Sequence, residues 1–248
     1  MYELISLILV FLIGILGSFV GSMVGSGGLL IIPFLMFVGL PVQIAVATNK
    51  FASLGLSSGA FISYFRAKRI QWEYVVPFIL IGIVSGYLGA NILINIDTEF
   101  LTKSVGFIIL LFLPFIFFKK NIGIKKTKIT KVRKSIGYVF YFLAMIWGAF
   151  FGGGGGTLVF YILMMFFGFT IIDASATNKI PWFLMSLFAV ILYAMNGLIN
   201  LLYGVFLIAG TFIGGYLGAR TAVKKGDRWV KTLFVIIVVA SAVKLIFF

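Results

Sequence analysis

The tetrapeptide Ala47-Thr48-Asn49-Lys50 recurs unchanged in the second half of the chain as Ala176-Thr177-Asn178-Lys179. The same spacing along the chain relates Gly86-Tyr87-Leu88-Gly89-Ala90 to Gly215-Tyr216-Leu217-Gly218-Ala219. Single residues between the blocks also match at this spacing without a gap. Chance explains two blocks at one spacing poorly, so the sequence predicts two homologous halves.

The composition places the chain in a membrane. Hydrophobic residues make up 62% of the sequence and charged residues only 10%, which is far from a soluble globular domain. Apolar stretches follow one another from Leu4 to Phe248 with short polar interruptions. Glu3 stands where a signal peptide would carry basic residues, so we expect the first stretch to be retained. The predicted fold class is an all-α integral membrane protein.

The apolar stretches divide into five segments in each half. They span 4–24, 28–40, 44–65, 74–94 and 101–118, then 135–153, 157–168, 175–195, 199–219 and 229–248. An odd number of segments makes the second copy enter the membrane from the opposite face. The sequence therefore predicts two inverted-topology repeats, at 1–118 and 135–248, joined by a basic linker at 119–134.

The net charge of +14 is concentrated in three loops, which hold 16 of the 20 basic residues. These loops are 66–69, 119–134 and 220–231. The positive-inside rule places them in the cytoplasm, and with this parity both termini lie outside a multi-pass protein of the inner (cytoplasmic) membrane. We expect the linker to be solvated and to touch anionic lipid headgroups rather than nucleic acid.

The second segment of each half is too short to span a bilayer alone, because a span needs about 20 residues. We expect 28–40 and 157–168 to form broken or re-entrant helical hairpins with the preceding segments, although crossing stays an alternative. The hairpins would turn near the midplane at Gly25-Ser26-Gly27-Gly28 and Gly152-Gly153-Gly154-Gly155-Gly156. Two helix N-termini meeting there would attract an anion, because their N–H groups are unsatisfied.

The repeated tetrapeptides supply further donors for an anion beside these turns. Each brings an ammonium, an amide and a hydroxyl group to the start of a long apolar segment. The alternatives are that the lysines extend to the membrane surface and that Thr and Asn only cap helices. The predicted substrate-binding residues are Gly25, Ser26, Gly27, Gly28, Thr48, Asn49 and Lys50, with Gly153, Gly154, Gly155, Gly156, Thr157, Thr177, Asn178 and Lys179.

Two further residues are candidates for ion coupling and for the substrate pathway. Asp173 could couple transport, although a helix-end or loop carboxylate, which could pair with Lys179, explains it better. Trp182 lies one turn after Lys179 and could line the pathway, whereas most aromatic residues, including the matched Tyr64 and Tyr193, are expected to anchor at the interface. Coupling to protons, coupling to sodium and uniport all stay open, as does a homodimer.

The absence of cysteine and histidine argues against an enzyme and against a metal site or cofactor. The Gly86/Gly89 and Gly215/Gly218 pairs are typical of close helix packing. An anion channel is the main rival to a carrier, but inverted halves with paired broken segments favour alternating access.

The chain resembles the TauE/SafE sulfite exporter family of membrane permeases. The resemblance rests on the glycine turn at 25–28 followed by Pro33, the Ala-Thr-Asn-Lys block, the Gly-Tyr-Leu-Gly-Ala block and their second copies. It implies a secondary transporter that exports a small sulfur-containing anion such as sulfite or an organosulfonate. Another small anion or an organic acid is the alternative. The second copy has Ile162 in place of Pro33 and Pro181 in place of Ala52, so the halves are not identical.

Overall fold

The computed structural model describes residues 2–25, 27–97 and 122–236, which form helices and turns and no strand. The first half contributes α1 (Tyr2–Val24), α2 (Gly28–Phe37), α3 (Val42–Arg66) and α4 (Trp72–Asn95), and the second contributes α7 (Lys131–Phe150), α8 (Gly155–Phe167), α9 (Ile171–Met195) and α10 (Leu201–Lys225). The prediction of an all-helical fold is confirmed. The predicted segment 101–118 and residues 237–248 of the last segment lie outside the described residues, while 229–236 are helical, so five segments per half stays a prediction.

The helices begin and end close to the predicted segments, with differences at the charged ends. Four described helices, α1, α4, α9 and α10, are long and apolar enough to cross a membrane, whereas α2 and α8 are short. α7 begins at Lys131, inside the range predicted for the linker, and α10 continues to Lys225, inside a predicted basic loop. Both helices therefore continue past their apolar parts into basic residues.

The third helix of each half keeps the spacing of the sequence repeat. α3 and α9 have 25 residues each and begin at Val42 and Ile171, which are matching positions of the two copies. Thr48 near the start of α3 accepts a hydrogen bond from the N–H of Asn200, beyond the end of α9. Thr177 near the start of α9 accepts one from Gln71, beyond the end of α3. The start of each helix thus lies beside the end of the other, and the two run antiparallel.

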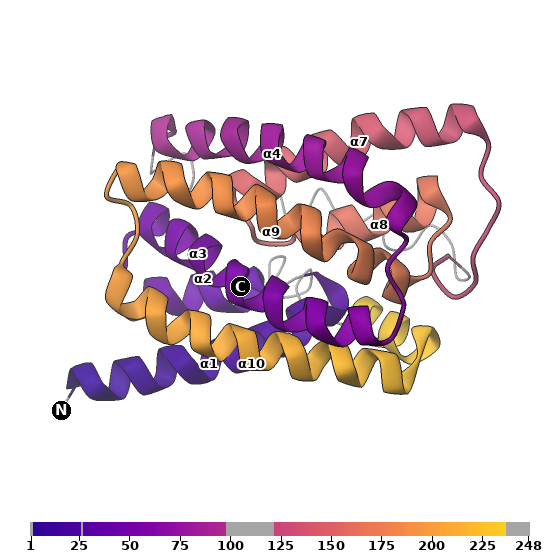
Figure 1. The fold of residues 1–248 in the computed structure, drawn as a ribbon. Coiled ribbons are helices and arrows are strands. Elements are labelled where there is room, and N and C mark those ends of the chain that lie inside the picture. The colour runs from indigo at the N-terminus through magenta and orange to yellow at the C-terminus, as the bar shows by residue number, and fades with distance from the viewer. Residues whose placement is uncertain (1, 26, 98–121, 237–248) are drawn as a thin grey trace.

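Helices of one half pack mainly on helices of the other. α10 packs along α1 and α3, and α4 packs along α7 and α9. Figure 1 shows the result, with α4 and α7 along one side, α1 and α10 along the other, and α3 and α9 between them. The two halves therefore share one structure rather than forming separate units.

Repeated glycines allow this close packing. A Cβ on Gly86 would lie 2.5 Å from the carbonyl oxygen of Met185 in α9, and a Cβ on Gly215 would lie 2.5 Å from that of Leu56 in α3. Real Cβ atoms do not approach so closely, so only glycine fits. The packing role expected for these glycines is confirmed.

The matched tyrosines Tyr64 and Tyr193 are not interfacial anchors, which corrects the expectation from sequence. Both are fully buried. The Tyr64 hydroxyl donates to the carbonyl of Ser22 at 2.9 Å, and the Tyr193 hydroxyl donates to that of Ala149 at 2.9 Å. Each tyrosine therefore holds the end of the helix that precedes a glycine turn.

Replacement of Gly86 by valine tests the packing of α4 on α9. We expect Gly86→Val to lower the free energy of unfolding by about 1–3 kcal/mol, as overpacking does in protein cores. Thermal unfolding in detergent measures the change, with Leu88→Val on the exposed side of the same helix as control. Equal melting temperatures for the two variants would contradict the packing described here.

Candidate functional site

Two glycine turns meet in the middle of the described structure. The first lies between α1 and α2, and the second lies between α7 and α8. Gly25 and Gly152 adopt φ angles of 78° and 77°, which favour glycine. A Cβ on Gly156 would lie 2.5 Å from the carbonyl oxygen of Gly25, so the turns are in direct backbone contact. Side chains at these positions would push the turns apart.

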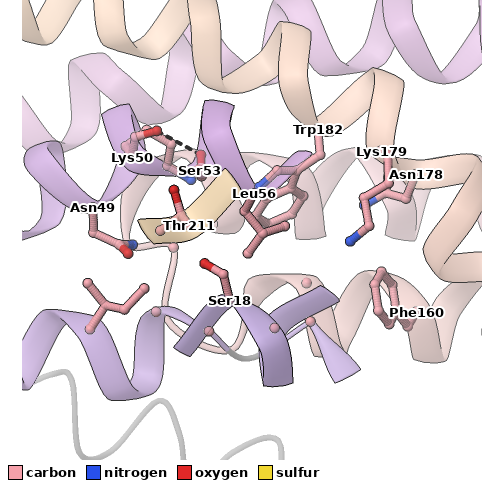
Figure 2. A pocket seen from close by; sticks show the side chains of 17 residues that line it. Ser18, Asn49, Lys50, Ser53, Leu56, Phe160, Asn178, Lys179, Trp182 and Thr211 are labelled. Carbon is pink, nitrogen blue, oxygen red and sulfur yellow. Dashed lines mark hydrogen bonds between the residues drawn. The ribbon is translucent and has the colours of Figure 1, made fainter. Parts of the chain in front are cut away.

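A small pocket lies between the two turns and helices α3 and α9 (Figure 2). Glycines of both turns line it, together with Asn49 and Lys50 from α3 and Asn178 and Lys179 from α9. Its volume is about 40 Å³, whereas one water needs roughly 10–15 Å³ on this measure. The pocket thus has room for a few waters or one small ion.

Both lysines of the repeated tetrapeptide are buried at this pocket. Lys50 is 1% exposed and Lys179 is 5% exposed, so neither extends to the surface. The Lys50 ammonium donates to the carbonyl of Gly148 and lies 4.9 Å from the ring centre of Trp182. The Lys179 ammonium lies 5.3 Å from the ring centre of Phe160. Rings and one carbonyl stabilise the two charges only partly.

The described lining of the pocket contains no carboxylate. Within the described part of the chain, Lys179 also has no hydrogen-bonding or ion-pairing partner. Uncompensated buried charges are costly in proteins. The described lining therefore offers basic and amide groups and no acidic group, which suits an anion better than a cation.

The two asparagines add donors beside the lysines. Asn178 accepts a hydrogen bond on Oδ1 from the hydroxyl of Tyr141 at 2.6 Å, which leaves its amino group as the free end. The Nδ2 atom of Asn49 faces the glycine turns, because a Cβ on Gly28 would lie 3.1 Å from it and one on Gly152 would lie 3.4 Å from it. Larger residues in the turns would block this amide.

Several predicted site residues do not line the pocket. The two threonines Thr48 and Thr177 instead hold the loops at Asn200 and Gln71, and each lies in the second turn of its helix rather than at the cap. Thr157 donates to the carbonyl of Val24 at 2.8 Å and ties one turn to the other. The remaining residues outside the lining are Gly153, Gly154 and Gly155, and Ser26 lies outside the described residues.

Other lining residues carry no distinctive motif. Ser18 from α1, Phe160 from α8 and Thr211 from α10 line the pocket, and no repeat singles them out. Ser53 lies about one helical turn after Lys50, so helical periodicity could have identified it. Trp182 also lines the pocket, and its role in a substrate pathway stays a prediction.

Asp173 lies away from the pocket and does not pair with Lys179. Its Oδ1 forms an ion pair with Nε of Arg69 at 2.8 Å, and its Oδ2 lies 3.3 Å from the ammonium of Lys126. Arg69 also bonds Asp227 at 2.7 Å and Thr170 at 3.0 Å. The helix-end position expected for Asp173 is confirmed, but its partner is Arg69.

This ionic network joins the three basic segments of the sequence. Arg69 follows α3, Lys126 belongs to the linker, and Asp227 follows α10. All three segments therefore meet at one end of the bundle, opposite the end where α1 begins (Figure 1). A common end agrees with the common side that the positive-inside rule predicts.

The comparisons with known proteins identify the family. The model of the family described as "Sulfite exporter TauE/SafE" matches residues 10–245. The chain belongs to the TauE/SafE sulfite exporter family. The resemblance seen in the sequence motifs is thereby confirmed.

Full-length relatives are named as membrane transporters. The chain is 27% identical to a "Probable membrane transporter protein" of Haemophilus influenzae, over 97% of this chain and 94% of that protein. It is 26% identical to a relative from Sinorhizobium, over 95% and 90%, and 24% identical to YfcA of Escherichia coli K12, over 96% and 88%. No solved structure matches significantly. This TauE/SafE member is a membrane transporter, with the pocket and the ionic network described above.

Removal of one partner from the network tests the contribution of Arg69. Arg69→Gln leaves the buried Asp173 carboxylate with Lys126 as its one described cation and with Asp227 as a like charge nearby, so we expect a loss of about 1–3 kcal/mol in the free energy of unfolding. The double variant Arg69→Gln/Asp173→Asn removes both charges and should lose less. Thermal unfolding in detergent compares them. A double variant that is less stable than Arg69→Gln would contradict the pairing.

Proposed function

We propose that the protein carries a small sulfur-containing oxyanion, such as sulfite or a small organosulfonate, through the pocket between the glycine turns. The observation that carries this proposal is the pair of buried ammonium groups, Lys50 and Lys179, in a pocket whose described lining has no carboxylate. The family name supplies sulfite as the first substrate to test. The charge and size of the pocket are independent support.

The electrostatic argument begins with the free energy of burial. A charged side chain inside a membrane costs at least about 2.5–3.5 kcal/mol unless it is compensated. An anion between the lysines would compensate both at once, and removal of water would strengthen the attraction. A cation in the same place would be repelled, so the site favours anions.

Backbone donors add to this attraction. The first turns of α2 and α8 begin at Gly28 and Gly155, and Gly28 and Gly156 line the pocket. N–H groups in the first turn of a helix have no partner within the helix, and the helix dipole is positive there. An oxyanion has several acceptor oxygens, so it can use ammonium, amide and backbone donors together.

The volume of the pocket favours a small substrate. About 40 Å³ suits a compact oxyanion better than a long organic acid in this conformation. A bulky organosulfonate would require the turns or Trp182 to move. Sulfite is therefore the better candidate than a large sulfonate.

Alternating access by inverted repeats is the mechanism we propose for transport. This proposal is supported by the antiparallel arrangement of α3 and α9. It is also supported by the packing of helices of one half on helices of the other. The network of Arg69, Asp173 and Asp227 would hold one end closed. In the first half, the position that matches Asp173 in the repeat holds the uncharged Ile44. Opening at the end that holds the network would require the ion pairs of Arg69 to break. We place this end in the cytoplasm.

Transport by lysine variants tests the proposed site. Proteoliposomes that hold wild type should take up labelled sulfite, and Lys50→Ala and Lys179→Ala should each lower uptake at least about tenfold, which corresponds to about 1.4 kcal/mol. Lys224→Ala, at the end of α10, is the matched control and should transport normally. If wild type carries a cation but no oxyanion, or if both pocket variants remain fully active, the proposal is wrong.

Cysteine labelling tests the gate, and the native chain has no cysteine to interfere. In inside-out vesicles, Ser53→Cys at the pocket should react with an impermeant thiol reagent several times faster when Arg69→Gln is added. The control is Lys224→Cys, an exposed residue at the network end of α10 that forms no ion pair of the network, and it should react at the same rate with and without Arg69→Gln. Equal rates with and without Arg69→Gln would show that the network does not close this end.

A further inference from the structure

We propose that Tyr141 is a positioning residue that makes the second half of the site a pure hydrogen-bond donor. This inference rests on the proposed function, because it concerns which anions the same pocket prefers. The observation is the hydrogen bond from the Tyr141 hydroxyl to Oδ1 of Asn178, at 2.6 Å. Tyr141 does not line the pocket, so it acts through Asn178.

The surroundings of Tyr141 hold its hydroxyl in place. The side chain is fully buried, and its ring stacks on Phe78 with ring centres 4.2 Å apart. Phe78 in turn contacts Tyr138 and Phe167 at 5.8 Å and 5.1 Å. A ring packed in such a cluster has little freedom to rotate, so the direction of the hydroxyl bond is fixed.

The fixed hydroxyl decides which end of the amide meets a ligand. An asparagine side chain has an acceptor oxygen and a donor amino group. Because Tyr141 occupies the oxygen, the amino group is the end left for a substrate. Lys179, the next residue, also offers only donors. An oxyanion without hydrogen atoms satisfies both groups, whereas a ligand that presents N–H or O–H to them leaves donors facing donors.

The first half has no equivalent of this arrangement. The position that matches Tyr141 in the repeat holds Leu12, which has no hydroxyl. Within the described part of the chain, the Asn49 amide has no hydrogen-bonding partner. The two half-sites therefore differ, with a fixed donor at Asn178 and an adjustable amide at Asn49.

Two ligands of nearly equal shape separate this role from a structural one. Sulfamate carries an amino group where methanesulfonate carries a methyl group, and both are singly charged. Each competes with labelled sulfite for uptake into proteoliposomes. Wild type should be inhibited more strongly by methanesulfonate. Tyr141→Phe frees Asn178 to turn its oxygen toward the ligand, so the preference should shift toward sulfamate about fivefold or more.

The expected kinetic signature is a higher KM for sulfite, by about threefold to tenfold, with the maximal rate retained. These factors correspond to about 0.65–1.4 kcal/mol, which is the size of one hydrogen bond. Tyr138→Phe is the matched control, because Tyr138 packs in the same aromatic cluster without bonding Asn178. It should keep both the KM and the preference of wild type.

The outcomes are distinguishable. If wild type takes up no sulfite, the proposed function fails before this inference is reached. If wild type transports and Tyr141→Phe keeps the wild-type ratio of the two inhibitors, the inference is overturned. Should Tyr141→Phe not assemble, Asn178→Ala replaces it. Loss of the preference for methanesulfonate in Asn178→Ala supports the inference, and an unchanged ratio there overturns it.

Discussion

Two ammonium groups buried in one small pocket set the physical constraint on which the rest of this structure depends. Lys50 and Lys179 are held by helices that begin at matching positions of the two copies and run antiparallel, so the sequence repeat brings two like charges into the same space. Their repulsion and desolvation must be compensated within the membrane. The ring of Trp182, the ring of Phe160 and one carbonyl do so in part, and a bound anion would complete the compensation.

The glycine turns let the backbone come close enough to form this pocket. Only residues without a side chain allow Gly25 and Gly156 to touch and leave the Asn49 amide room beside Gly28. The helices α2 and α8 start at the same turns, and Gly28 and Gly156 line the pocket. The buried tyrosines Tyr64 and Tyr193 hold the helices that lead into the turns. The two lysines, the glycine turns and the starts of α2 and α8 thus lie at one pocket.

The halves share this framework but differ in the groups added to it. Tyr141 fixes Asn178, whereas Leu12 stands at the matching position in the first half. The ion pairs of Arg69 form at one end of the bundle, and Ile44 matches Asp173 at the other. Equivalent helices therefore give a transporter whose two half-sites and two ends are chemically different.

Patterns that depend on periodicity were predictable from sequence, and contacts between distant segments were not. Apolar length indicated the helices, and the glycine runs indicated the breaks before α2 and α8. The repeat identified both buried lysines. The repeat also selected Thr48 and Thr177 as site residues, but these bond the loops at Asn200 and Gln71. In a sequence, a repeated polar residue looks the same whether it binds a ligand or the backbone. The partner of Asp173 shows the same limit, since only the antiparallel packing of α3 and α9 brings Arg69 from the first half to the start of α9.

The most direct test of an anion site between the two lysines is the anomalous scattering of selenium in crystals soaked with selenite, a close chemical analogue of sulfite. We predict one selenium peak in the pocket, with oxygen atoms within about 3 Å of the Lys179 ammonium. A pocket without selenium, in crystals where selenite occupies only the basic segments at the network end, would contradict the account.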